Sequence, residues 1–133
     1  MALGDFHSNL DKEFAAVTEL WSPRVVAAAN GRYVKVVKVE GEFVWHAHAD
    51  EDEFFLVRKG TLIIRYRDRP DVTLGEGDFH VVPRGVEHMT AAPEECWLVL
   101  IEPAATKHTG DTATDMAKSI EVQTAHLRGG RSA

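Results

Sequence analysis

Between residues 24 and 102 the chain is a succession of short runs rich in β-branched and aromatic residues, separated by turn-forming residues at short, even intervals. Asn30-Gly31 separates the first two runs and is a typical two-residue hairpin turn. Seven to nine such strands, with no helical stretch between them, predict an all-β sandwich or barrel and exclude a parallel α/β sheet. The predicted strands are residues 24–29, 32–39, 42–48, 53–58, 61–67, 71–74, 79–82, 88–91 and 96–102.

A different pattern precedes the strands. Between residues 8 and 21 apolar residues recur at the spacing of one helical face, and Pro23 follows the end of the pattern. This predicts an amphipathic N-terminal α-helix whose apolar stripe packs on the core or, alternatively, forms a dimer interface. The stripe consists of Leu10, Phe14, Val17, Leu20 and Trp21.

The 133 residues suit one domain with a real core. We expect an N-terminal helical segment over residues 1–23, a β-barrel over 24–103 and a C-terminal extension over 104–133. Within the extension, residues 116–120 are expected to form one helical turn and residues 127–133 a mobile tail.

The overall charge and composition argue against several classes of partner. The net charge of −6, from 21 acidic and 15 basic residues, opposes binding to nucleic acid. No apolar run is long enough to span a membrane, and the first residues do not resemble a secretory signal. A single cysteine, Cys96, cannot form an internal disulfide and is expected to be a small buried strand residue. These features predict a cytoplasmic protein that binds neither nucleic acid nor membrane.

Four residues form the strongest candidate site. Residues two apart on a strand project to the same face, so His46 and His48 would present their imidazoles side by side. Glu53 follows an acidic loop and opens an apolar strand, where a buried carboxylate needs a partner such as a metal cation. His88 begins another strand, directly after a turn that Pro83 and Gly85 impose.

Two motifs in this region resemble those of the cupin superfamily. The pattern Gly41-x4-His46-x-His48-x4-Glu53-x6-Gly60 resembles the first cupin motif, and Gly77-x5-Pro83-x-Gly85-x2-His88 resembles the second. Two positions depart from the family: one residue fewer separates Gly41 from His46, and Ala92 stands where an asparagine is common.

The resemblance implies a small single-domain member, with a conical jelly-roll β-barrel and a metal ion near its mouth. His46, His48, Glu53 and His88 would be the ligands, matched one by one. Three imidazoles and one carboxylate suit Fe, Mn, Ni, Co or Zn better than Mg or Ca, which prefer oxygen ligands. Four protein ligands leave positions open on an octahedral ion, as in catalytic sites.

Several further residues are weaker candidates. His80 is a possible general acid or base, or alternatively a core or rim histidine. Residues that share a strand face with the ligands are candidates for the wall of a substrate pocket, or for plain core: Val44, Phe55, Val57 and Thr90. Trp45 and Trp97 are expected to pack against the N-terminal helix or a second subunit.

The leading functional hypothesis is a metal-dependent enzyme, of oxygenase, isomerase or decarboxylase type, acting on a small polar molecule whose oxygen atoms bind the ion. The alternative is a non-catalytic protein that binds or senses a small sugar-like or acidic ligand through the same metal. Because this fold serves many reactions, the sequence does not choose between them. We also expect a homodimer, since a small barrel leaves edge strands to be covered.

Overall fold

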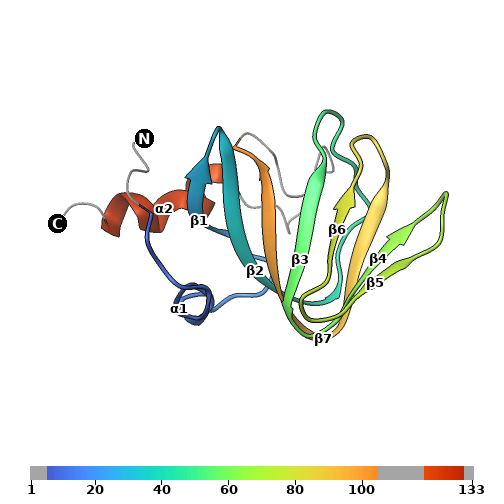
Figure 1. Cartoon of the computed structure of the whole chain (residues 1–133), viewed down its shortest axis with the longest axis horizontal. Helices are drawn as coiled ribbons and strands as arrows, with labels where there is room; N and C mark the ends of the chain where they lie inside the picture. Colours follow the sequence, from blue (N-terminus) through green and yellow to red (C-terminus); the bar gives the residue numbers. More distant parts are fainter. Residues whose placement is uncertain (1–5, 105–118, 131–133) are drawn as a thin grey trace.

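The computed structural model describes residues 6–104 and 119–130. Within this part of the chain, seven strands are flanked by two helices, which confirms the predicted all-β class with an N-terminal helix (Figure 1). In chain order the elements are α1 (Leu10–Ala15), β1 (Arg24–Ala29), β2 (Arg32–Glu42), β3 (Glu53–Lys59), β4 (Leu62–Tyr66), β5 (Val72–Leu74), β6 (Phe79–Val82), β7 (His88–Pro103) and α2 (Ile120–Gly130).

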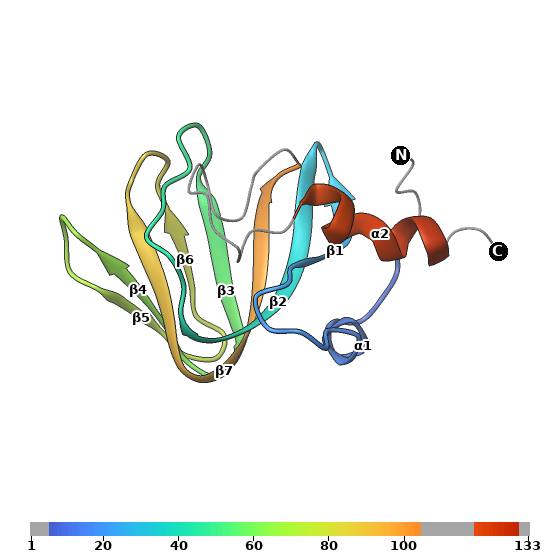
Figure 2. The same cartoon turned by 180° about the vertical axis from the view of Figure 1, so that it is seen from behind.

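All strand pairs are antiparallel, and β7 is the strand that connects them. One path of hydrogen-bonded strands runs β1-β2-β7-β3-β6, while β4 pairs with both β7 and β5. The beginning of β7 pairs with β4 and its second half with β2 and β3, so this bent strand belongs to both layers of the jelly roll (Figures 1 and 2). Among the described residues β5 and β6 are not paired with each other, so the barrel is open between these two strands.

Two predicted strands, 88–91 and 96–102, are thus one continuous strand of 16 residues. The prediction divided it at Pro93, because proline cannot donate a hydrogen bond to a sheet. In the structure Pro93 lies at the bend, beyond Ala91 and Ala92, where β7 passes from one layer to the other.

Glycine and asparagine shape the turns. Asn30 and Gly31 both have positive φ, at 52° and 74°, as the predicted two-residue hairpin requires. Gly60 ends the first motif with φ of 87°, and a Cβ there would lie 2.8 Å from the carbonyl oxygen of Glu95. Only glycine therefore fits where β3 turns into β4 against the bend of β7.

Inward-facing residues of both layers form the main core. Alternate positions of β2, β3, β4 and β7 contribute side chains such as Val37, Phe55, Ile64 and Leu98, all buried. Cys96 belongs to the same cluster, as predicted, and burial raises the pKa of its thiol to about 12. The thiol is therefore neutral and shielded at physiological pH.

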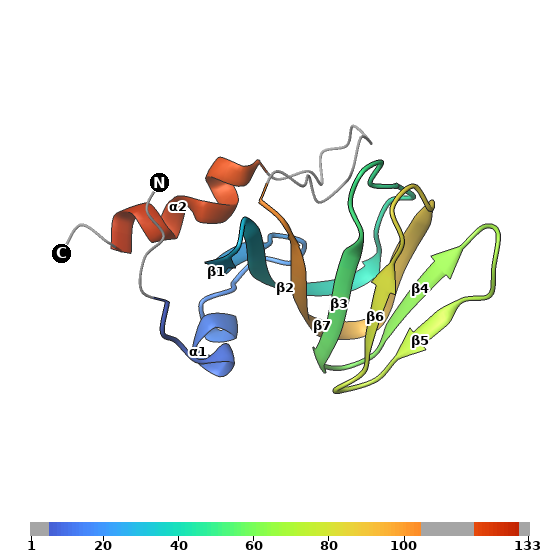
Figure 3. The same ribbon diagram turned by 45° about the horizontal axis from the view of Figure 1, so that its top comes forward.

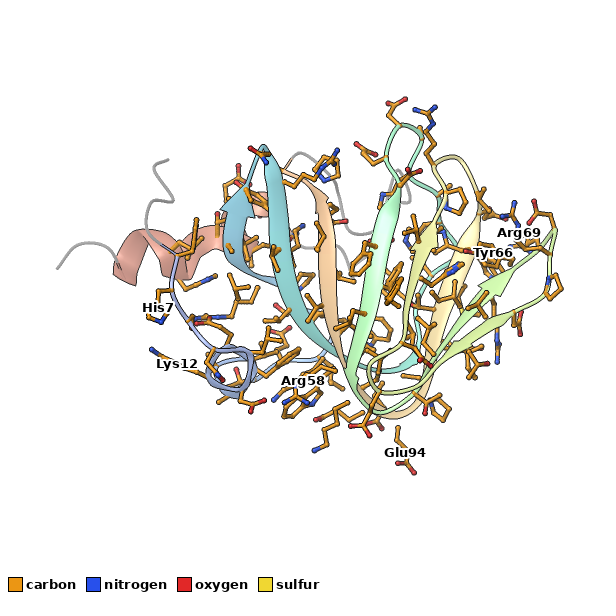
Figure 4. The ribbon with its side chains drawn as sticks, in the orientation of Figure 1. His7, Lys12, Arg58, Tyr66, Arg69 and Glu94 are labelled. Atoms are coloured by element: carbon orange, nitrogen blue, oxygen red, sulfur yellow. The ribbon has the colours of Figure 1, made fainter. Side chains whose placement is uncertain are left out.

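A second cluster joins α1 to the outer face of the sheet. Phe14 and Val17 pack against Val36 of β2 and Val99 of β7, and the ring of Phe14 stacks on Trp97 with centroids 5.0 Å apart. Core packing of the helical stripe is confirmed for these two residues, as is the contact between Trp97 and the helix. Arg58 of β3 adds an ion pair with Asp11 on this side of the molecule (Figure 4).

Helix α1 is shorter than predicted. Asn9 caps its start by accepting hydrogen bonds from the amides of Asp11 and Lys12, but regular helix ends at Ala15 rather than near Trp21. The prediction was wrong for the last turn and a half because tertiary contacts prevail over helical periodicity there. Trp21 instead adopts a φ of 60°, and its amide donates to the carbonyl of Lys38 on β2.

The C-terminal extension also differs from its prediction. Helix α2 continues to Gly130, so residues 127–130 are helical, whereas the rest of the expected tail (131–133) lies outside the described residues. The predicted turn at 116–120 mostly lies outside them too. Helix α2 lies beside β1, at the end of the molecule away from the β4–β5 hairpin (Figure 3). Gln123 and Thr124 are buried there, and a ring nitrogen of His126 lies 2.7 Å from the carbonyl of Val25.

Two observations concern the predicted surroundings of the molecule. The helices within the described ranges are too short or too polar to cross a membrane.

The outer face of β3, β6 and β7 carries an apolar patch that includes Phe79, 65% exposed, with Val81 and Ile101. The homodimer stays a prediction; in the described part of the chain this patch and the stripe residues Leu10 and Leu20 are exposed apolar surface.

Replacement of Phe14 by alanine is expected to lower the free energy of unfolding by about 3–5 kcal/mol, because it removes a fully buried ring that joins α1 to the sheet. Leu10→Ala, at the exposed first residue of the same helix, should change it by only about 0.5 kcal/mol. Chemical denaturation followed by circular dichroism measures both. Equal effects of the two substitutions would contradict the described packing of α1.

Candidate metal centre

The two motifs meet through backbone hydrogen bonds. The amide of His46 donates to the carbonyl of His88 at 3.0 Å, and the amide of His88 donates back to His46 at 2.9 Å. The amide of Gly85 also donates to the carbonyl of His48, at 2.8 Å. The Pro83–Gly85 turn of the second motif is therefore held directly against the histidine pair of the first.

The predicted strand over residues 42–48 is mostly absent. Strand β2 ends at Glu42, and beyond it only His46 forms an isolated bridge, to His88. The chain leaves the sheet here because it must cross between the two layers before β3 begins at Glu53. His46 and His48 nevertheless lie on the same side of this extended segment, as two-residue alternation predicts.

The four predicted ligands come together inside the barrel. One ligand atom of each of His46, His48, Glu53 and His88 lies within 4.8 Å of every other, and all four side chains are buried. Glu53 Oε1 lies 3.4 Å from His48 Nε2 and 3.5 Å from His88 Nε2. One ion at about 2.0–2.2 Å from each ligand would require separations of this order.

Backbone carbonyls fix the orientation of two of the imidazoles. His46 Nδ1 lies 2.9 Å from the carbonyl oxygen of Val44, and His88 Nδ1 lies 3.0 Å from that of Val86. A carbonyl only accepts, so each Nδ1 must carry the proton. The other nitrogen, Nε2, is then left with a free lone pair directed at Glu53 or the centre of the cluster, which is the tautomer that a metal ligand needs.

The electrostatics of the cluster favour neutral His46 and ionised Glu53. Burial, together with the neighbouring His88, lowers the pKa of His46 to about 4. Burial alone would raise the pKa of Glu53, but the imidazoles of His48 and His88 outweigh it and hold that pKa well below its usual range. Burial by itself would lower the pKa of His48. The neighbouring Glu53 carboxylate outweighs burial, and the pKa of His48 is raised.

These residues fit a divalent cation. His48 Nε2, His88 Nε2 and Glu53 Oε1 are all buried atoms without a well-aligned hydrogen-bond partner. Buried polar atoms in this state are costly, and they converge from separate segments of the chain. A cation between them would satisfy all three at once. The cluster thus fits a metal site of the kind that the resemblance implied.

A buried ion pair beside Glu53 was missed in the sequence. Lys35 Nζ lies 2.7 Å from Glu102 Oε1, and both side chains are fully buried. Burial and the nearby Glu53 carboxylate raise the pKa of Glu102 to about 7, while Lys35 opposes the rise. Two-residue alternation was the signal that could have found this pair. It places Lys35 on the same inward face of β2 as Val37, and it places Glu102 on the same inward face of β7 as Leu100.

His80 has a defined partner that the sequence did not suggest. Its Nε2 lies 2.7 Å from the hydroxyl of Tyr66, a buried residue whose ring centroid is 6.5 Å from that of His88. The guanidinium of Arg69 lies 5.1 Å from the Tyr66 ring centroid, and Figure 4 shows the two side chains together beyond β4. Burial and Arg69 lower the pKa of His80. Its acid–base role stays a prediction.

A cavity adjoins the ligands on the inner side of the barrel. Phe55 and Thr90, two of the predicted pocket residues, lie in its wall together with His46 and Glu53. Val57 belongs to the core instead, and Val44 contributes its carbonyl to His46 rather than a side chain to the cavity. The guanidinium of Arg67 covers the ring of Trp45 at 4.1 Å, and the expected packing of Trp45 on the helix or a second subunit stays a prediction.

Comparison with known proteins agrees with this architecture. The Bacillus subtilis (strain 168) uncharacterized protein YdbB is 34% identical over 65 residues, which cover 49% of this chain and 58% of YdbB. The crystal structure of a cupin-2 domain containing protein from Shewanella frigidimarina NCIMB 400 is 51% identical, with a TM-score of 0.70 over 72% of this chain and 93% of that one. Protein NMB1881 from Neisseria meningitidis is 32% identical, with a TM-score of 0.67 over 73% and 98%.

A family model described as "Cupin domain" (Cupin_2) matches residues 33–102, which include all four candidate ligands and both motifs. This match covers more than half of the sequence, and the two solved structures superimpose on most of the chain. The chain therefore belongs to the cupin family, as a type-2 member of the superfamily.

Proposed function

We propose that the protein is a metal-dependent enzyme that binds one divalent transition metal ion through His46, His48, Glu53 and His88. The observation that carries the proposal is the convergence of four buried ligand atoms, two of them with their tautomer set by backbone carbonyls. The nitrogen-rich donor set suits Fe, Mn, Co, Ni or Zn. When bound, such an ion supplies Lewis-acid or redox chemistry to a small ligand with oxygen donors.

The chain's own residues would orient that ligand and exclude water. The cavity reaches His46 and Glu53, so a molecule within it lies beside two of the ligands. The buried Lys35–Glu102 pair lies beside Glu53, so these two side chains would form part of the surroundings that position the Glu53 ligand. His80, hydrogen-bonded to Tyr66, lies outside the ligand set and would carry a proton if the reaction requires one.

A non-catalytic binding or sensing protein is the second candidate, and the cavity wall favours it. Apart from the two ligands His46 and Glu53, the lining side chains in the described part of the chain include one polar residue, Thr90. A catalyst usually places an acid or base within reach of the reacting atoms, and Thr90 is a weak one. We also propose a cytoplasmic location and a homodimer, whichever of the two functions applies.

Substitution of the ligands tests the site. His88→Ala and Glu53→Ala are each expected to reduce the metal content from about one ion per chain to near zero, because each removes one of four ligands. Elemental analysis after dialysis measures the metal, and circular dichroism monitors the fold. Glu51→Ala, in the adjacent acidic loop, is the matched control and should retain the ion. Unchanged metal content in both ligand variants would contradict the assignment, and unfolding of both would indicate a structural ion instead.

Metal retention should fall as the pH drops through about 6.5, because a proton competes with the ion for each Nε2. In the metal-free protein His48 should be protonated before His46, since the pKa of His48 is raised and that of His46 is lowered to about 4. Retention is therefore full at pH 8 and declines progressively toward pH 5. Dialysis across this range followed by elemental analysis provides the measurement. A flat profile is the result that the three-histidine site does not allow.

The identity of the ion separates the two candidate functions. We expect about one ion per chain in protein purified without added metal, and this preparation is then tested for oxygen uptake with a panel of small oxygen-containing molecules. Iron with substrate-dependent oxygen consumption supports an oxygenase. Zinc or nickel with conversion of a substrate and no oxygen uptake supports an isomerase or a decarboxylase. A bound ion with ligand binding but no conversion of any panel member supports the binding protein and contradicts the enzyme.

A further inference from the structure

The cavity beside the metal centre has an apolar wall. Its aliphatic lining comes from the inward faces of β2 and β7: Val37, Val39, Leu98 and Leu100. Three aromatic residues, Trp21, Phe43 and Phe55, complete most of the remainder. The inner part of the cavity has a volume of only about 40 Å³, and the cavity opens to solvent, so the body of a ligand would lie along its open wall rather than inside a closed chamber.

Trp21 lines this cavity and packs against the inner core of the barrel. It lies in the segment between α1 and β1, and its φ of 60° is rare for a large side chain. Two hydrogen bonds to β2 hold it in this conformation: its amide donates to the carbonyl of Lys38 at 2.9 Å, and its Nε1 donates to that of Glu40 at 3.2 Å. Strained backbone that neighbouring contacts enforce is characteristic of functional positions.

The indole continues as a row of rings to the metal ligands. Trp21 stacks on Phe43 with centroids 4.7 Å apart and planes 9° from parallel. Phe43 in turn meets the ring of His46 edge-on, with centroids 5.5 Å apart. A ligand that binds the ion from this cavity would therefore have these rings in the wall beside its body.

We infer that the site selects a small molecule with oxygen donors at one end and a flat apolar body, and that Trp21 is the residue that determines this specificity. The inference rests on the proposed metal site and narrows its substrate class. A sugar-like molecule is disfavoured, because Thr90 is the one polar lining residue beyond the two ligands and most hydroxyl groups would lose their hydrogen bonds on entry. A planar ring loses none and gains stacking against Trp21 and Phe43.

Two probes with the same metal-binding group separate the head of the ligand from its body. Acetohydroxamate and benzohydroxamate both bind metals through two oxygen atoms, and only the second carries a phenyl ring. The full chain is loaded with Co²⁺, whose visible spectrum reports both the ion and the binding of each hydroxamate. We expect benzohydroxamate to bind at least about tenfold more tightly than acetohydroxamate. Equal affinities in the wild-type protein would overturn the inference.

The variant Trp21→Ala tests the assigned residue. It should bind cobalt and acetohydroxamate as the wild type does, while the preference for benzohydroxamate falls to about threefold or less. Trp97→Ala is the matched control, because it removes an indole from the opposite face of the sheet and should keep the preference. Phe43→Leu is a second variant with the same expected loss, should Trp21→Ala fail to fold. A preference that persists in both cavity variants overturns the role of the ring row.

Failure of the proposed function would look different. If the wild-type protein shows no cobalt spectrum, the metal site itself is wrong and the inference falls with it. If cobalt binds and both hydroxamates bind equally, the metal site stands and only the apolar specificity is overturned.

Discussion

Two hydrogen bonds between His46 and His88 join parts of the chain that are 42 positions apart, and the arrangement of the metal centre depends on them. They fix the separation of the two backbones at the point where both imidazoles turn inward, with ring centroids 4.4 Å apart. Because β7 starts at His88 and then pairs with β4, β3 and β2, this junction is also where the two layers of the jelly roll meet. The fold and the site therefore share one constraint.

Burial makes that constraint demanding. A carboxylate and three imidazoles in a buried interior require compensation. Carbonyls of Val44 and Val86 satisfy the outer nitrogens of His46 and His88, and the inner atoms are left for a cation. Lys35 and Glu102 form a second buried pair against Glu53, so the interior holds one more acid and one more base than the ligand set alone. Removal of one member of such a pair is far more damaging than removal of both, because it leaves a buried charge without a partner.

Sequence reasoning found what local pattern and fixed spacing determine. Alternation placed His46 and His48 on one side, the start of an apolar strand singled out Glu53, and Pro83 with Gly85 located His88. It missed features that depend on contacts between distant segments: the end of α1 before Trp21, the continuity of β7 through its bend, and α2 against β1. The same alternation could have placed Lys35 on the inward face of its strand, but a lysine between valines is ordinarily assigned to the solvent face.

The kind of ligand expected from the structure also differs from the one expected from the sequence, because the cavity wall depends on contacts between distant segments. From sequence, the strand faces beside the motifs predict a cavity, and the donor set predicts a molecule that offers oxygen atoms. The aromatic part of the cavity wall includes Trp21, which stacks on Phe43 and whose backbone takes a conformation that no periodic pattern predicts. An ion held by Glu53 and three histidines attracts oxygen donors of many kinds, so it discriminates little between them. Selection among molecules with oxygen donors must then come from the side chains that contact the rest of the ligand. In the described part of the cavity wall, beyond the two metal ligands, these side chains are aromatic or aliphatic, apart from the hydroxyl of Thr90.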